Sequence, residues 1–210
     1  MVAAVWVVLL RFVQGETLSL LLPVFLFFNV NVTTFYFLAG LVLFEKGEGT
    51  LEALVTTPLR PAEYLLSKIV ALSLFASVES CVIVLIGYGT DLRWPPLIAG
   101  MLLLCAQYCL IGFLTVVRYD SISEYLIPSS LIMFAIQLPF LDALGIVESP
   151  IFHAWPTYAP LLLLQGAFGS IGVANAVYGV TYAALWIALL AFVAERSFHR
   201  FVVRREGVRA

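Results

Sequence analysis

The chain has 210 residues and a formal net charge of −2; 62% of its residues are hydrophobic and only 11% are charged. Soluble domains carry about 25% charged residues, and a mean hydropathy of +1.04 exceeds what a water-soluble fold of this length could bury. The composition therefore excludes an ordinary soluble enzyme or binding module and indicates a protein that is partly dissolved in lipid.

Long apolar segments follow one another along the chain, and they predict helices because a segment in lipid must satisfy its backbone polar groups internally. The first segment, residues 2–14, is shorter than the roughly 20 residues that a span needs, and it lacks the features of a signal peptide. Either Arg11 reaches an interface and completes this span, or residues upstream of Met1 are missing. Full spans are predicted at residues 22–44, 64–87, 94–117, 125–142 and 173–194. The expected fold is an all-α polytopic membrane protein with six spans, the first of them partial, in one domain of residues 1–210.

A charged loop, residues 45–63, separates the second and third spans. Thr50 predicts a helix N-cap with Glu52 in the first turn, and Pro58 stops the helix after Thr57. Three apolar side chains share one face of this helix: Leu51, Leu54 and Val55. A helix of about two turns is unstable alone in water, so we expect it to dock either on the lipid surface or on a cytosolic partner.

Glu79 lies near the middle of the third span, where an ionisable group costs about 2.5–3.5 kcal/mol. Its side chain is expected to face protein or water, either as part of a substrate path or subunit seam or as a structural acid bonded to a neighbouring helix. Four other polar side chains within spans predict interhelical hydrogen bonds or a polar translocation path: Asn29, Asn31, Gln107 and Gln137. Gly100 and Gly112 predict close helix packing.

The outer segment, residues 143–172, contains three prolines and cannot form a full span, so it predicts short broken helices that dip into the outer leaflet. Residues 195–210 form a basic tail that indicates anchoring beside anionic lipids and gives no reason to expect nucleic-acid binding. Lys and Arg side chains gather on one side of the predicted spans, nine against two. By the positive-inside rule this side, including the C-terminus, faces the cytoplasm.

Several kinds of chemistry find no support in the sequence. The three cysteines lie in apolar runs without His or carboxylate at ligand spacing, so they predict packing and no metal site. The phosphate-binding pattern G-x-x-x-x-G-K-[ST] is absent from the sequence, so ATP would have to be held by another chain. No catalytic residues and no cofactor are predicted for this chain.

The loop between the second and third spans carries the motifs EKGEGTLEAL (45–54), TPLR (57–60) and YLLSK (64–68). This run resembles the signature of type-2 ATP-binding-cassette (ABC) permeases, in which the equivalent stretch forms a coupling helix that seats in a groove of the ATPase. Residues 121–129 and 201–207 resemble the fluoroquinolone-export branch. The resemblance implies ten ATPase-coupling residues: Glu45, Glu48, Gly49, Thr50, Leu51, Glu52, Leu54, Val55, Thr57 and Pro58.

The resemblance implies the permease subunit of an ABC exporter in the cell membrane, which moves an amphipathic small molecule or drug outward. Its expected partners are a separate ATPase chain that holds ATP and Mg²⁺, a second permease copy or a sister permease, and lipids. Two other functions stay open from the sequence: an ion-coupled secondary transporter that uses Glu79, and a non-transporting membrane anchor or assembly subunit.

Overall fold

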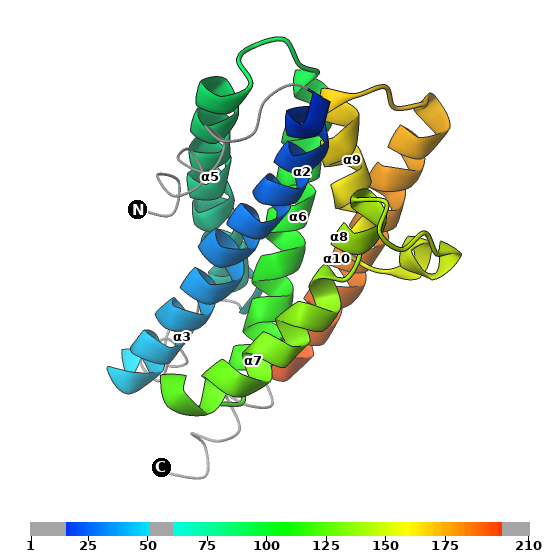
Figure 1. Cartoon of the computed structure of the whole chain (residues 1–210). Coiled ribbons are helices and arrows are strands. Elements are labelled where there is room, and N and C mark those ends of the chain that lie inside the picture. Colours follow the sequence, from blue (N-terminus) through cyan, green and yellow to red (C-terminus); the bar gives the residue numbers. More distant parts are fainter. Residues whose placement is uncertain (1–15, 51–60, 199–210) are drawn as a thin grey trace.

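The computed structural model describes residues 16–50 and 61–198, and within these ranges every regular element is helical (Figure 1). The elements are α2 (Glu16–Asn31), the π-helix η1 (Val32–Tyr36), α3 (Phe37–Gly47), α5 (Pro61–Gly87), α6 (Trp94–Val116), α7 (Ile122–Gln137), α8 (Phe140–Ala143), the 3₁₀ helix η2 (Pro150–Ala154), α9 (Tyr158–Phe168) and α10 (Val173–Phe198). Four helices in these ranges are long and apolar enough to cross a membrane: Thr17–Gly47, Ala62–Gly87, Trp94–Val116 and Val173–Phe198. They confirm an all-α membrane protein and match the predicted second, third, fourth and sixth spans.

The first of these long helices joins α2, η1 and α3 into 31 residues with a π-helical turn at its middle. A π turn leaves a backbone carbonyl without its usual i+4 amide partner, and such turns are often found at functional sites. Thr34 Oγ1 donates a hydrogen bond to the Val30 carbonyl at 2.6 Å, so one carbonyl before the π turn is bonded by a side chain.

Helix α6 runs through the middle of the bundle and packs against α5, α9, α10 and the first long helix (Figure 1). Two glycines permit these close approaches. A Cβ atom on Gly100 would lie 3.1 Å from the Leu164 backbone nitrogen, and one on Gly112 would lie 3.1 Å from the Phe35 carbonyl oxygen. The prediction that both glycines serve helix packing is confirmed.

The predicted fifth span, residues 125–142, differs from the structure. Helix α7 covers only 16 residues, ends at Gln137 and is followed by the four-residue α8. Pro139 lacks a backbone N–H and so cannot continue the α7 hydrogen-bond ladder. A six-span count is therefore not supported by the described residues, and the first predicted span, residues 2–14, lies outside them.

The predicted short broken helices of residues 143–172 are confirmed as η2 and α9, but α9 is not superficial. It lies almost entirely buried between α2, α6 and α10. Two side chains just before it bond the last carbonyls of α7: Trp155 Nε1 donates to Ala135 at 2.9 Å, and Thr157 Oγ1 donates to Ile136 at 2.6 Å. These bonds satisfy carbonyls that a helix end otherwise leaves unpaired.

The bundle has two chemically different ends. The end of α3, the start of α5, the end of α6 and the end of α10 meet at one end, which we call the Lys46 end. It carries most of the described basic side chains: Lys46, Lys68, Arg118 and Arg196. The opposite end, where α5 leads into α6, carries Arg93, whose backbone N–H bonds the Ala167 carbonyl of α9 at 2.9 Å.

Candidate coupling site

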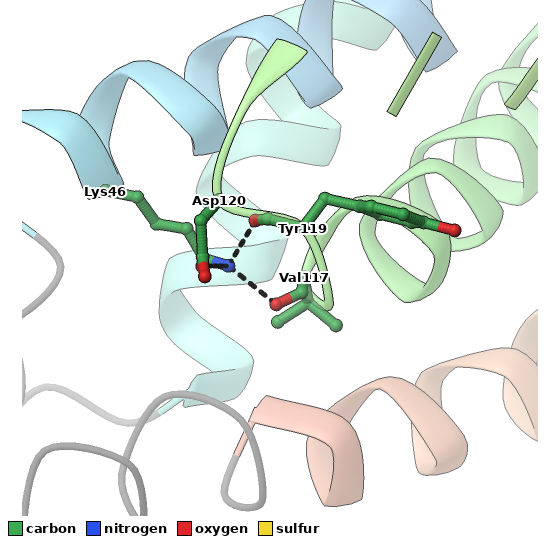
Figure 2. A network of polar contacts seen from close by, with 4 residues as sticks. All are labelled: Lys46, Val117, Tyr119 and Asp120. Carbon is green, nitrogen blue, oxygen red and sulfur yellow. Dashed lines mark hydrogen bonds and ion pairs between the residues drawn. The ribbon is translucent and has the colours of Figure 1, made fainter. Parts of the chain in front are cut away.

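Lys46, in the last turn of α3, ties the beginning of the predicted coupling loop to the turn between α6 and α7. Its ammonium donates hydrogen bonds to the carbonyl oxygens of Val117 and Tyr119, both at 2.7 Å, and lies 3.4 Å from the Asp120 carboxylate (Figure 2). Its side chain is 16% exposed. A cation placed on the last carbonyls of a helix also interacts favourably with the helix dipole. Lys46 therefore acts as a cap on α6 that is supplied by another helix.

Glu45, the preceding residue, reaches α5 instead. Its carboxylate accepts a 2.6 Å hydrogen bond from Tyr64 Oη and an ion-paired hydrogen bond from Lys68 Nζ. The Lys68 ammonium also lies 5.4 Å from the centroid of the Tyr64 ring. The Glu45 and Lys68 side chains are 18% and 21% exposed, so this pair is better shielded from water than a surface ion pair. The two flanks of the loop are thus joined across α3 and α5.

The chain turns sharply where it leaves α3. Glu48 N–H bonds the Phe44 carbonyl at 3.0 Å, and Gly49 N–H bonds the Lys46 carbonyl at 3.2 Å. Gly49 has φ of +71°, a left-handed conformation that glycine adopts without strain and that commonly ends helices. Thr50 is already helical in the structure, whereas the sequence predicts it as the cap of a helix that starts at Leu51. This difference of one residue is the usual uncertainty of helix ends.

The structure places only part of the predicted coupling surface. Glu48 and Thr50 are exposed at the Lys46 end, whereas the Glu45 carboxylate is engaged within the chain. The other predicted coupling residues lie outside the described residues: Leu51, Glu52, Leu54, Val55, Thr57 and Pro58. The sequence analysis did not predict that Lys46 and Asp120 are partners. The available signal was a basic residue near the end of one apolar segment and an acidic residue just after the end of another.

Glu79 is half-buried and meets the π turn of the first long helix. Its Oε2 accepts a 2.7 Å hydrogen bond from Thr33 Oγ1, and Thr33 is 1% exposed. The predicted structural role, an acid bonded to a neighbouring helix, is present in this geometry. Thr33 was not singled out from the sequence, since a threonine in a span ordinarily bonds its own helix.

The other predicted path residues come from three helices: Asn29 and Asn31 from α2, Gln107 from α6 and Gln137 from α7. Gln107 is fully buried and donates from Nε2 to the Ala183 carbonyl of α10 at 3.3 Å. This is an interhelical hydrogen bond of the predicted kind. Asn29 is also fully buried, but neither polar atom of its amide has a partner in the part of the chain that the structure describes. Asn31 and Gln137 are buried with one unpaired side-chain atom each. Glu79, by contrast, accepts from the Thr33 side chain of the first long helix.

The described residues hold no group of three or more His, Cys, Asp or Glu side chains that could bind a metal ion. Cys81, Cys105 and Cys109 are free thiols, and the last two are buried.

Comparison with known proteins agrees with these features. A model of the fluoroquinolones export permease protein family matches residues 1–206. The fluoroquinolones export permease proteins of two Mycobacterium tuberculosis strains, CDC 1551 / Oshkosh and ATCC 25618 / H37Rv, are each 35% identical over 193 residues, which is 89% of this chain and 80% of theirs. No solved structure matches the chain. The resemblance to type-2 ABC permeases is confirmed, and the chain belongs to the fluoroquinolones export permease family.

Proposed function

We propose that this chain is the membrane subunit of an ATP-driven exporter that moves an amphipathic small molecule outward. A separate ATPase chain binds ATP and Mg²⁺ and grips the segment around residues 48–58. The Lys46 end, together with the C-terminus, faces the cytoplasm, and a second copy or a sister permease completes the pathway. Family membership supports transport; the coupling, sidedness and substrate class are part of the proposal.

One observation carries the coupling step: Glu45 and Lys46 bond both the start of α5 and the turn between α6 and α7. A pull on the segment that follows Lys46 would therefore act on three elements at once. Without these contacts, the predicted coupling helix could move while the spans kept their positions. The contacts are polar and few, so they can be exchanged for others when the spans change position, as an alternating-access cycle requires.

Gly49 suits the same mechanism. Its left-handed backbone lies two residues after the end of α3 at Gly47, so the coupling segment begins close to the Lys46 contacts. Because few residues separate the segment from Lys46, a displacement of the segment would act on the Lys46 contacts.

The proposal is tested by photo-crosslinking in the native membrane. A photoreactive amino acid at Leu54 is expected to capture a chain that contains a phosphate-binding P-loop, because Leu54 belongs to the apolar face of the predicted coupling helix. The matched control carries the same group at Val147, which is 45% exposed and distant in sequence from the coupling loop. Capture of lipid alone at Leu54, with no P-loop chain, would overturn the proposal.

A second function has one specific observation in its favour. The Thr33–Glu79 hydrogen bond places an ionisable group at the π turn of a span, where proton binding would break or reverse a contact between helices. In an ion-coupled transporter, export would persist without the ATPase and stop when the proton gradient is dissipated. An ATP-driven exporter behaves in the opposite way, so transport into inverted vesicles with ATP or with a proton gradient separates the two.

A further inference from the structure

An apolar groove lies between α5, α6 and α10 in the half of the bundle near the Lys46 end. Its volume is about 470 Å³, within the range of about 300–1,000 Å³ typical of small-molecule pockets. Helix α5 contributes Leu66 and Ile69, α6 contributes Leu110, and α10 contributes Ile187 and Ala191. The groove is therefore built by three helices and is not the bare face of one.

The groove exists because α5 and α10 both pack on α6 and only slightly on each other. Small side chains leave the space between them open: Ala62, Ala106 and Ala191. Toward the Lys46 end, Phe198 contacts the Tyr64 ring at 5.7 Å and the Phe113 ring at 6.1 Å between centroids. This aromatic contact joins α5, α6 and α10 just beyond the groove.

Among the described residues that line the groove, Glu195 is the one with a charged side chain. Within residues 16–50 and 61–198, no side chain forms an ion pair with it. The adjacent Arg196 lies over the Phe192 ring, 4.2 Å from its centroid, and does not neutralise Glu195. An apolar groove that ends at a carboxylate without an ion-pair partner among the described residues is complementary to a molecule with an apolar body and a cationic group.

We propose that this groove binds an amphipathic cation, with its apolar body between α5 and α10 and its positive group at the Glu195 carboxylate. The proposal rests on the function proposed above and names its substrate class. A position near the Lys46 end, which that function assigns to the cytoplasm, suits a molecule that is collected from the inner leaflet. The carboxylate lies at the edge of the span, where a charge is tolerated better than at the depth of Glu79.

The experiment uses the full chain in nanodiscs of zwitterionic lipid, with empty nanodiscs as the blank. Tetraphenylphosphonium and tetraphenylborate serve as probes, because they share one shape and carry opposite charges. Glu195→Gln is expected to weaken tetraphenylphosphonium binding about tenfold and to leave tetraphenylborate binding unchanged or stronger. Ala191→Trp fills the groove and is expected to weaken the binding of both ions.

Two matched controls accompany these variants. Glu148→Gln removes an exposed carboxylate outside the groove, and Ala174→Trp adds the same bulk to an exposed position near the start of α10; neither is expected to change binding. Thermal unfolding verifies that each variant is folded.

The proposal fails if Glu195→Gln leaves tetraphenylphosphonium binding unchanged, or if it weakens both ions equally, since the carboxylate would then not select charge. It also fails if Ala191→Trp has no effect, because the groove would then hold only lipid. The assay contains no ATPase, so these outcomes do not depend on whether the chain is driven by ATP. Crosslinking at Leu54 tests that separate question.

Discussion

The Lys46 ammonium lies 2.7 Å from the carbonyl oxygens of both Val117 and Tyr119, so a residue at the end of α3 caps the C-terminal end of α6. The two helices are separated by α5 in the sequence. They pack against each other, and the Lys46 side chain adds polar contacts at this end. The preceding Glu45 bonds Tyr64 at the start of α5. Two neighbouring residues thus connect α3, α5 and α6 at one end of the bundle.

Lys46→Met keeps most of the apolar stem and removes the ammonium, leaving two carbonyls without their donor. Because hydrogen bonds to charged groups contribute about 1.5–3 kcal/mol and this side chain is largely shielded, we expect a lower thermal midpoint. Export should fall several-fold while ATP hydrolysis by the complex continues. Lys46→Arg retains the charge and should keep part of the activity. Export equal to wild type in Lys46→Met would remove this residue from the coupling step.

The contact between Glu45 and Tyr64 is tested by a double-mutant cycle. Tyr64→Phe removes the donor and with it the hydrogen bond, Glu45→Gln removes the carboxylate that accepts this bond and pairs with Lys68, and the double variant combines both changes. Residues in one polar network show interaction energies of about 0.5–3 kcal/mol, so the double variant should lose less stability than the sum of the single ones. Unfolding in detergent provides the measurement, and strict additivity would mean that the two groups do not interact.

The sequence predicted the long apolar helices well because span length and hydropathy are local properties. It predicted the end of α7 poorly. The missing N–H of Pro139 is a local signal that hydropathy outweighed, whereas the bonds from Trp155 and Thr157 to the last α7 carbonyls are tertiary contacts. A coupling role for residues 45–63 was predicted from the motif alone, whereas the Lys46 contacts join residues more than 70 positions apart. Likewise, the carboxylate of Glu79 was visible in the sequence, whereas its partner Thr33 required the π turn.

The contact of Thr33 with Glu79 gives a prediction of its own. Thr33→Val keeps the shape and removes the hydroxyl that bonds the half-buried Glu79 carboxylate, and such a hydrogen bond contributes about 0.5–1.5 kcal/mol. Stability should fall, and Thr33→Ser should restore most of it. Thr181→Val is the control, because the Thr181 hydroxyl is exposed and bonds only carbonyls of its own helix. Equal effects of the two valine variants would show that the Glu79 contact contributes nothing particular.

Helix α10 approaches α9 closely at Gly179. A Cβ atom there would lie 2.8 Å from Leu163 Cγ and 3.3 Å from the Ala159 carbonyl oxygen, and Leu163 is 2% exposed. Gly179→Ala should therefore force the two helices apart and cost about 1–3 kcal/mol, although alanine favours a helix by about 1 kcal/mol. Gly40→Ala in α3 meets nothing within 4 Å, so it should be neutral or stabilising. Thermal unfolding of the two variants in the same detergent measures the difference, and a stabilised Gly179→Ala protein would mean that α9 and α10 pack less tightly than described.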